Sequence, residues 1–263
     1  MSAWRGLLCL GLATMAVMVA GWRWQCRREN AGIVDVLWAA SLGTGAVFLA
    51  AVGNGAVAPR ALLAVIGGVW GGRLARHLWR RVWDKPEDGR YRQLRSQWPR
   101  NPWRWLAFFE SQALVVVLFA LPFVAVAVNP HPRGPWLAAG ALIGLVSVLG
   151  EASADRQLAR FTADAAHRGL TCRSGLWRYS RHPNYFFEWL HWFAYVALAA
   201  GSPLWALSWL GPVLMLIFLW RVSGIPWTEA QALRTRGEDY RAYQRSTSMF
   251  FPWFPRSPDE TRS

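Results

Sequence analysis

The sequence contains little cysteine, lysine and acid, and each shortage narrows what the protein can be. Its 3 cysteines (Cys9, Cys26 and Cys172) have neither metal-ligand nor disulfide spacing, so we predict no metal site and no redox motif. Lys85 is the only lysine and falls in a polar segment, which excludes a pump whose retinal forms a Schiff base within the membrane. The chain has only 15 acidic residues, so a carboxylate inside an apolar segment is unusual and indicates a function or a bonding partner.

Apolar and aromatic residues are abundant instead. The chain of 263 residues is 54% hydrophobic and carries 19 Trp, which is typical of an integral membrane protein and not of a soluble domain. A bilayer is crossed by about 20 apolar residues. Stretches near that length lie at about 6–21, 32–53, 60–79, 103–128, 135–150, 184–200 and 203–220. We therefore predict an all-α membrane helix bundle with about seven transmembrane helices.

The basic residues indicate how the bundle is oriented. Of the 29 Lys and Arg, 25 lie in 22–29, 76–104, 153–183 and 221–263, which are the segments between alternate apolar stretches. By the positive-inside rule, the N-terminus is outside and the C-terminus is cytoplasmic, and we expect a bacterial inner membrane. Because the arginines do not form one surface, no nucleic acid partner is predicted. No repeat or long linker divides residues 1–263, so we expect a single domain.

Several polar segments follow from helical spacing. Residues 61–82 are expected to form a helix that leaves the membrane, and the helix beginning near 135 should continue past Gly150. Residues 84–101 have the composition of a cytoplasmic loop. From Thr228 the chain is expected to form an amphipathic helix, and the aromatics of 250–255 suit an interfacial or packed anchor.

The segment 175–191 (Gly-Leu-Trp-Arg-Tyr-Ser-Arg-His-Pro-Asn-Tyr-Phe-Phe-Glu-Trp-Leu-His) is the clearest candidate for binding. A helix should begin at Pro183, since proline is tolerated at a first helical position and disfavours helical angles in the residue before it. Helix starts attract anions. We therefore predict a phosphate-binding entrance, with a carboxylate one turn deeper, made by Arg178, Arg181, His182, Asn184, Tyr185 and Glu188.

Four carboxylates lie in or at the ends of apolar segments, where a charge is costly: Asp35, Glu110, Glu151 and Glu188. Such groups either serve function or bond to a neighbouring helix. Asp35 and Glu110 are candidates to hold a polar group of a substrate, although Glu110 equally suits a salt bridge to Arg73 or His77. In the tail, Tyr240 and Tyr243 share a helical face beside arginines, which suits an adenine ring or plain packing on the membrane surface.

These motifs, with Asn30, Asp35 and Trp38, the segment 87–91 and the tail Gly-Glu-Asp-Tyr-Arg-Ala-Tyr, resemble the domain of unknown function 1295 (DUF1295) family, which is similar to the steroid 5-alpha-reductase C-terminal domain. The resemblance implies a membrane reductase that binds NADPH from the cytoplasmic side, mainly through residues of about 150–263. It implies reduction of a carbon–carbon double bond conjugated to a carbonyl in a lipophilic substrate that enters from the bilayer.

The resemblance also suggests roles for single residues. It implies cofactor contacts by Asp155, Asn184, Tyr185, Glu188, Glu229 and Tyr243, to which we add Arg178, Arg181, His182 and Tyr240 from the patterns above. The carbonyl-polarising acid and tyrosine of steroid reductases have no matching motif here, which leaves Asp35, Glu110 and Tyr91 as catalytic candidates.

Two departures from the family pattern concern the cofactor. Phe187 stands where related reductases often have glycine, so it is expected to crowd the nicotinamide end. Trp227 and Thr228 stand where sterol reductases have an Arg-Asp pair, so the contacts there are expected to be rearranged.

Two other classes of function remain open at this point. The Arg-His-Pro-x-Tyr core and the paired tail tyrosines are also similar to isoprenylcysteine carboxyl methyltransferases and phospholipid methyltransferases, which use S-adenosylmethionine. Asn184 together with Glu188 favours the reductase. A non-enzymatic multi-helix membrane protein is the third alternative, although no internal repeat indicates a transporter. The substrate and the oligomeric state are not predicted.

Overall fold

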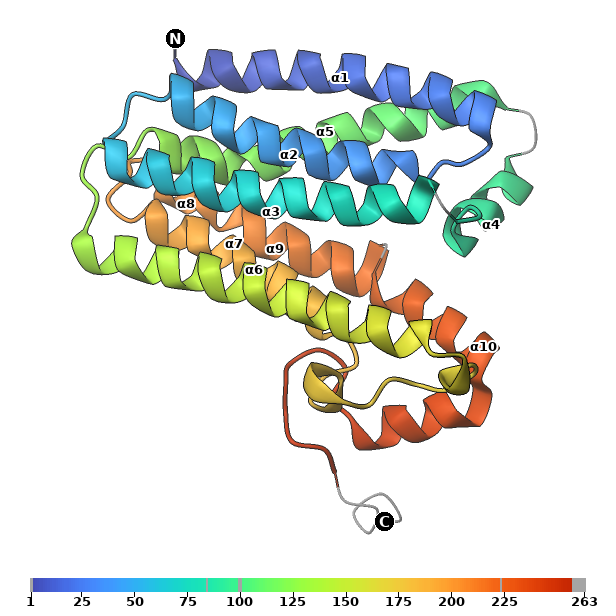
Figure 1. Cartoon of the computed structure of the whole chain (residues 1–263). Coiled ribbons are helices and arrows are strands. Elements are labelled where there is room, and N and C mark those ends of the chain that lie inside the picture. The colour runs from blue at the N-terminus through green and yellow to red at the C-terminus, as the bar shows by residue number, and fades with distance from the viewer. Residues whose placement is uncertain (1, 84, 99–100, 223, 257–263) are drawn as a thin grey trace. The chain divides into compact units, whose positions relative to one another are not determined.

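The structure, a computed structural model, describes residues 2–83, 85–98, 101–222 and 224–256. Within these ranges the regular elements are all helical (Figure 1). In chain order they are α1 (Ala3–Arg28), α2 (Ile33–Val52), α3 (Val57–Trp83), α4 (Gly89–Gln97), α5 (Pro102–Ala127), α6 (Gly134–Ala163), η1 (Ala165–His167), η2 (Gly175–Arg178), α7 (Pro183–Leu198), α8 (Trp205–Ser208), α9 (Leu210–Ile217), η3 (Phe218–Val222) and α10 (Ile225–Ser246).

The helices group into two compact units. Unit 1 comprises Met1–Ala141 and Ala194–Gly211, and unit 2 comprises Leu142–Phe193 and Pro212–Ser263. Both α6 and α7 contribute to each unit. The single domain of 1–263 stays a prediction.

Small residues bring α2 and α3 close together in unit 1. A methyl group at Gly43 would lie 3.0 Å from the Cα atom of Gly71, and one at Gly67 would lie 2.4 Å from the Cβ atom of Ala46. Gly67 and Gly71 are one turn apart on α3, the spacing that lets helix backbones approach within a membrane. Close packing of α2 on α3 therefore depends on these positions lacking side chains.

Five helical segments are long and apolar enough to cross a membrane: Ala3–Arg28, Ile33–Val52, Pro102–Ala127, Gly134–Ala163 and Trp205–Ser246. They indicate an integral membrane protein. The C-terminal half of α3 carries several arginines and α7 has only 16 residues. The count of seven spans and the orientation stay predictions.

The last of these segments is not one regular helix. It begins with α8 and α9, continues as one turn of π-helix in η3, and then enters α10. Its apolar residues precede α10, whereas α10 itself carries acidic and basic residues along its length. We therefore place α10 outside the membrane-spanning part.

Several local predictions are confirmed. The seventh α-helix begins at Pro183, α6 continues well past Gly150, and α3 remains helical through its arginines. The tail is helical over Ile225–Ser246. These helices were predictable because proline and helical spacing are local signals.

The prediction of a loop over 84–101 is wrong, because Gly89–Gln97 forms α4. The side chain of Asp88 accepts a hydrogen bond from the backbone N–H of Arg90 at 3.0 Å and so caps the helix. Tyr91 is buried against residues of α1, α2 and α5, so packing stabilises a helix whose composition is polar. Residues 84, 99 and 100 lie outside the described ranges.

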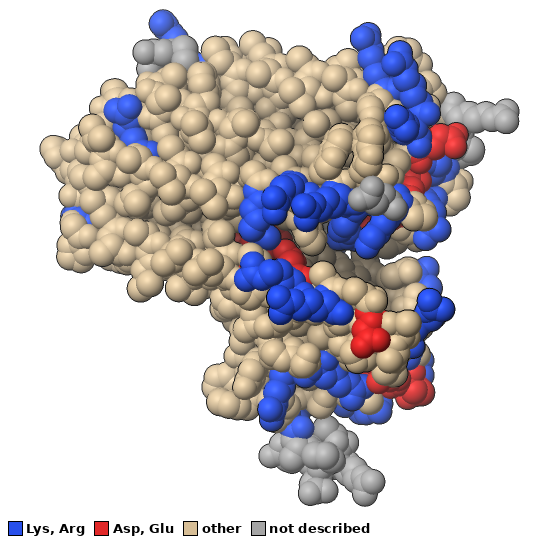
Figure 2. All heavy atoms as spheres, in the orientation of Figure 1, with Lys and Arg blue, Asp and Glu red and all other residues tan. Residues whose placement is uncertain are grey.

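Most charged side chains of unit 1 gather at one end, and Figure 2 shows a few basic side chains at the other end. On the face in Figure 2 most of the charged side chains of this unit lie where α1 and α3 end and around α4, while the flanks of the helices carry other residue types. The last turns of α1 and α3 contribute Arg27, Arg28, Arg80 and Arg81. This asymmetry fits helices whose flanks face lipid and whose basic end faces water.

Candidate functional site

Two of the three predicted catalytic residues meet at the basic end of unit 1. The hydroxyl of Tyr91 donates a hydrogen bond to Oδ1 of Asp35 at 2.7 Å. Arg90 Nη2 donates to Oδ2 of Asp35 at 2.7 Å and to the Tyr91 hydroxyl at 2.8 Å. We refer to Asp35, Arg90 and Tyr91 as the Asp35 set. It joins the first turn of α2 to the first turns of α4.

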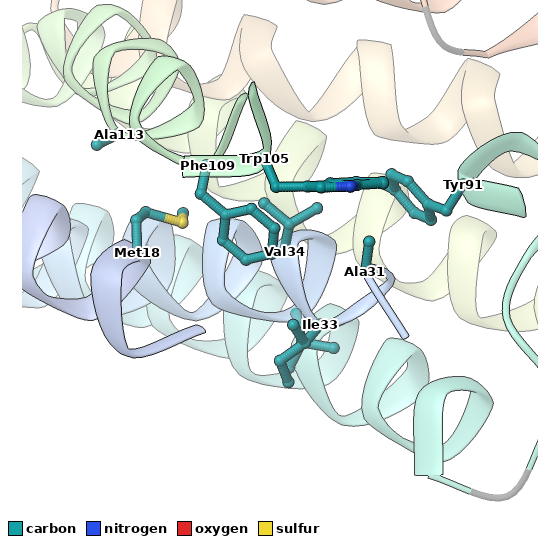
Figure 3. Close-up of a cluster of buried hydrophobic side chains, with 9 residues drawn as sticks. Met18, Ala31, Ile33, Val34, Tyr91, Trp105, Phe109 and Ala113 are labelled. Atoms are coloured by element: carbon teal, nitrogen blue, oxygen red, sulfur yellow. The ribbon is translucent and has the colours of Figure 1, made fainter. Parts of the chain in front are cut away.

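The members of the Asp35 set differ in burial, and burial affects the pKa of Tyr91. The Tyr91 ring lies in an apolar cluster with Trp105, Val34 and Ala31 (Figure 3). The Asp35 side chain, in contrast, is 36% exposed. Burial, with the neighbouring Asp35 carboxylate, raises the pKa of Tyr91 well above its usual value, although Arg90 opposes the shift. Tyr91 therefore remains a proton donor at neutral pH.

A second ion pair braces the segment that carries Tyr91. Arg95 donates to both carboxylate oxygens of Glu87, at 3.0 Å and 2.8 Å, and Glu87 Oε1 also accepts the backbone N–H of Ala31 at 2.8 Å. Arg95 further donates to the side chain of Gln25 at 3.2 Å. A bidentate arginine–carboxylate pair fixes direction as well as distance. The turn between α1 and α2 is thereby tied to α4.

Glu110, the third catalytic candidate, does not join this set. It follows Phe109 on α5, and both of its carboxylate oxygens are buried without a hydrogen-bond donor among the described residues. The suggested salt bridge from Glu110 to Arg73 or His77 is therefore not observed. A buried carboxylate without donors has capacity for a polar group that the chain itself does not provide.

Four of the ten predicted cofactor residues meet in unit 2, at Glu229 of α10. Oε1 of Glu229 contacts Arg181 Nε at 2.7 Å, the Tyr240 hydroxyl at 3.2 Å and His182 Nε2 at 3.3 Å. Its other oxygen accepts from Gln244 Nε2 at 2.8 Å. We call this arrangement the Glu229 hub. Each predicted member was chosen as a cofactor contact, and here each is bonded to another part of the chain.

The Glu229 hub is almost closed to water. The side chains of Arg181 and Glu229 are 10% and 15% exposed. Hydrogen bonds from His182, Arg181 and Gln244 outweigh the effect of burial and lower the pKa of Glu229 to about 2. Burial lowers the pKa of His182, although Glu229 opposes the shift. Glu229 is therefore a carboxylate, and Arg181 is its buried counter-ion.

Further bonds attach the segment before α7 to the tail. Arg181 Nη1 donates to the carbonyl oxygens of Gln244 at 3.0 Å and Thr247 at 2.9 Å. Tyr243 is buried and donates to the carbonyl oxygens of Ser180, at 3.1 Å, and Trp177. The rings of Tyr240 and Tyr243 are 5.8 Å apart, so the two do share a face, but that face packs within the chain.

A glycine shapes the chain so that the tail can return to the Glu229 hub. Gly237 interrupts α10 with φ 52° and ψ −121°, angles that side chains strongly disfavour. This break separates the part of α10 that holds Glu229 from the part that holds Tyr240 and Gln244. Reversal at Gly237 thus lets one helix supply both the carboxylate and two of its donors.

The remaining predicted cofactor residues lie outside the Glu229 hub. Arg178 is exposed at the end of η2. Asn184, Tyr185 and Glu188 are partly buried on the first two turns of α7, and Asp155 is partly buried on α6. At the start of α7, the N–H of Phe186 donates to the His182 carbonyl. The N–H groups before Phe186 precede the regular hydrogen bonding of the helix.

The two departures from the family pattern have visible contacts. The ring of Phe187 lies against Gly150 of α6, where an added methyl group would be 2.5 Å from it, so a small residue on α6 accommodates the large one on α7. The hydroxyls of Thr228 and Tyr185 are 3.2 Å apart, and Thr228 also donates to the Gly224 carbonyl at 3.0 Å.

Sequence reasoning missed the donors that complete both sets. Arg90 belongs to the segment 87–91 that carries the family resemblance but has no predicted role, and Gln244 is not among the candidates. Arg90 is 55 residues from Asp35, and Gln244 is 15 residues from Glu229 and beyond the break at Gly237. Neither separation is a helical period, so no local pattern indicates these pairs. For Arg90 the available signals were the density of charged residues around it and its place in the segment 87–91 that carries the family resemblance.

Comparisons with known proteins agree with the motifs. No curated protein and no solved structure matches the chain significantly. A family described as "Protein of unknown function (DUF1295)" matches residues 21–247, a range that includes the Asp35 set, the start of α7 and the Glu229 hub. The match covers most of the chain, and the protein therefore belongs to the DUF1295 family.

Proposed function

We propose that this protein is a membrane-embedded reductase that uses NADPH to reduce a carbon–carbon double bond conjugated to a carbonyl in a lipophilic substrate. The observation that carries the proposal is the Asp35 set: a tyrosine kept protonated, bonded to a carboxylate and an arginine at the end of apolar helices. Its family is compatible with steroid 5-alpha-reductase-like membrane proteins. We propose that the site faces the cytoplasm.

The Asp35 set has the donors that this reaction needs at the carbonyl. Negative charge develops on the carbonyl oxygen during reduction, and donors held in position stabilise it. Tyr91 and Arg90 are such donors, and Asp35 orients both. To serve a substrate, the Tyr91 hydroxyl turns from Asp35 to the carbonyl oxygen, while Arg90 keeps Asp35 paired. The partial exposure of Asp35 supports access of a ligand to this end of unit 1.

The residues of unit 2 are compatible with a dinucleotide phosphate. Arg178 is exposed and forms no hydrogen bond with a described side chain, so its charge is available to a phosphate group. The N–H groups at the start of α7 add to this preference for anions. NADPH, when bound, supplies the hydride. We propose that Asn184, Tyr185, Glu188 and Asp155 contact it, and that Arg181, His182, Glu229, Tyr240 and Tyr243 hold the α7 start in place.

Ligand binding by the purified full chain tests this proposal. NADPH should raise the unfolding temperature more than NADH, and S-adenosylmethionine should leave it unchanged, because stabilisation follows ligand concentration relative to the dissociation constant. The variants Asn184→Ala and Glu188→Ala should each weaken the NADPH effect. Glu238→Ala, which changes an exposed carboxylate on α10, is the matched control.

Turnover provides the second measurement. Oxidation of NADPH at 340 nm should depend on a lipophilic enone and not on the corresponding saturated ketone. Stabilisation by S-adenosylmethionine alone would overturn the proposal in favour of a methyltransferase. Equal NADPH binding by wild type, Asn184→Ala and Glu188→Ala would remove its main support in unit 2.

A further inference from the structure

A cavity lies at the end of unit 1 opposite the Asp35 set. It has a volume of about 590 Å³, and its wall includes His131, Arg133, Trp136, Gly201 and Trp205. These residues come from the connection between α5 and α6 and from the connection between α7 and α8. The volume is in the range of small-molecule sites, about 300 to 1,000 Å³. None of the roles proposed above uses this cavity.

The wall of the cavity is held in place by buried contacts. Asn129 is fully buried and donates to the carbonyl oxygens of Leu198 at 2.9 Å and Ala200 at 3.2 Å, while its own side-chain oxygen accepts the N–H of His131 at 3.2 Å. Gly201 has φ 103°, and a side chain there would overlap the carbonyl oxygen of His131. One amide thus joins both connections, and the cavity is a formed feature of the fold.

The charge at this end favours an anion. The connecting residues 53–56, 128–133 and 199–204 contain no Asp or Glu. Arg60 is used within the chain, since it donates to the carbonyl oxygens of Ala50, Ala51 and Gly55. Arg133 is exposed beside the cavity, and its side chain forms no hydrogen bond or ion pair with a described residue. It therefore has its hydrogen-bonding capacity available for a ligand.

The other walls favour a lipid. Trp136 and Trp205 are 47% and 42% exposed, and both lie at helix ends where segments able to cross a membrane begin. Tryptophan is enriched at the level of lipid headgroups. Because the described wall contains no acidic residue, an ammonium group would sit beside Arg133 without a partner. A headgroup with a phosphate and no amine fits this wall better.

We propose that this cavity binds the phosphate of an anionic phospholipid such as phosphatidylglycerol, through Arg133, with the glycerol backbone and acyl chains against the tryptophans. Binding is independent of the reductase proposal, because the two sets of residues do not overlap. Native mass spectrometry of the full chain in detergent, with phosphatidylglycerol and phosphatidylethanolamine at equal concentration, measures the preference.

Wild type should retain phosphatidylglycerol in preference to phosphatidylethanolamine. Arg133→Gln should weaken phosphatidylglycerol binding by about tenfold or more, as expected for a charge-assisted hydrogen bond, and Arg133→Lys should keep most of it. Trp136→Leu should weaken binding by a smaller factor. Arg5→Gln is the matched control, because Arg5 is an exposed arginine at the start of α1 and outside the cavity wall.

Three results would overturn the proposal. Equal binding by wild type and Arg133→Gln would show that Arg133 does not hold the phosphate. Equal losses in Arg133→Gln and Arg5→Gln would reduce the effect to surface charge. Displacement of the lipid by an equal concentration of glycerol phosphate would make the cavity a site for a soluble anion.

Discussion

The Asp35 set and the Glu229 hub are built from the same residue types, but their carboxylates differ in exposure and in the number of hydrogen bonds they accept. Each places a carboxylate against an arginine and a tyrosine. Asp35 receives two donors and its side chain is 36% exposed, whereas Glu229 receives four and its side chain is 15% exposed. The chain satisfies Glu229 completely, and it leaves Asp35 open on one side.

This difference separates structural from functional roles more clearly than residue type does. A buried ion pair with all its hydrogen bonds made has nothing to offer a ligand, and losing one partner leaves an uncompensated charge. A partly exposed carboxylate that orients a tyrosine and an arginine can exchange one of those bonds for a substrate. We therefore expect changes at the Glu229 hub to affect folding and changes at the Asp35 set to affect turnover.

The largest effect is expected for Glu229→Ala. It leaves the Arg181 guanidinium buried without its counter-ion, which should cost about 3 to 5 kcal/mol of unfolding free energy. The loss is measured by thermal or denaturant unfolding in detergent. Glu238→Ala is the control: Glu238 pairs with Arg241, but its side chain is 73% exposed, so the cost should be about 0.5 kcal/mol or less. Similar small losses in both variants would contradict the structural role of the hub.

Tyr91→Phe should affect turnover strongly and stability only slightly. Loss of the hydroxyl should lower kcat for an enone by about 10²- to 10³-fold, as when one oxyanion donor is removed. The unfolding free energy should fall by only about 1 kcal/mol, because the ring keeps its apolar contacts. Enone-dependent NADPH oxidation and unfolding are measured on the same preparation.

Tyr179→Phe is the matched control for Tyr91. The hydroxyl of Tyr179 forms no hydrogen bond with any described residue, although its ring contacts Phe254 edge-on. Its kcat should stay near that of wild type. If Tyr91→Phe retained full turnover as well, the Asp35 set would be a structural brace like the Glu229 hub, and the comparison would fail.

A smaller loss is expected for Gly237→Ala, which tests how the Glu229 hub is assembled. No atom would contact the added methyl group, so any effect comes from the backbone alone. Holding alanine at φ 52° and ψ −121° should cost about 1 to 3 kcal/mol. Unfolding measurements check this, with Thr235→Ala on the exposed side of α10 as a control. An unchanged stability would mean that the reversal at Gly237 is not required.

Local signals predicted much of the fold. The start of α7 at Pro183, the continuation of α6 and the helical tail each follow from residues within one or two turns. The polar α4 was missed because its stability comes from Tyr91 packing on distant helices. The apolar run 203–220 predicts one helix, because hydropathy does not distinguish α-helix from the π-helical turn of η3.

The site was predictable as a set of residues and not as a set of contacts. Asp35, Tyr91, Arg181, His182, Glu229 and Tyr240 are all candidates from the sequence, yet the sequence does not predict which of them bond to one another. A charged residue near an apolar segment signals that it needs a partner. It does not signal whether the partner is a ligand or another part of the chain, since that depends on burial and on residues far apart in sequence. Arg181 illustrates this: a cation beside a helix start suggests a phosphate, and its contacts are Glu229 and two carbonyl groups.

The smallest expected effect, and a reversible one, is that of mild acid on the Glu229 hub. A carboxyl whose pKa is about 2 when folded and about 4.3 when unfolded adds stability above pH 4.3, and this contribution declines as the pH falls toward 2. Between pH 7 and pH 4 the loss from this carboxyl should be about 0.6 kcal/mol. His182, whose pKa is lowered by burial, adds a loss of the same sign below its usual pKa of about 6.5, since the unfolded chain binds that proton more readily. Because Glu229 opposes the shift of the His182 pKa, the two contributions are separated in His182→Gln, where the histidine no longer titrates. Adding Glu229→Gln to that variant should remove the loss of stability between pH 5 and pH 4. Parallel pH profiles would mean that Glu229 is not held as a carboxylate by Arg181, and the contrast with the open Asp35 would then rest on exposure alone.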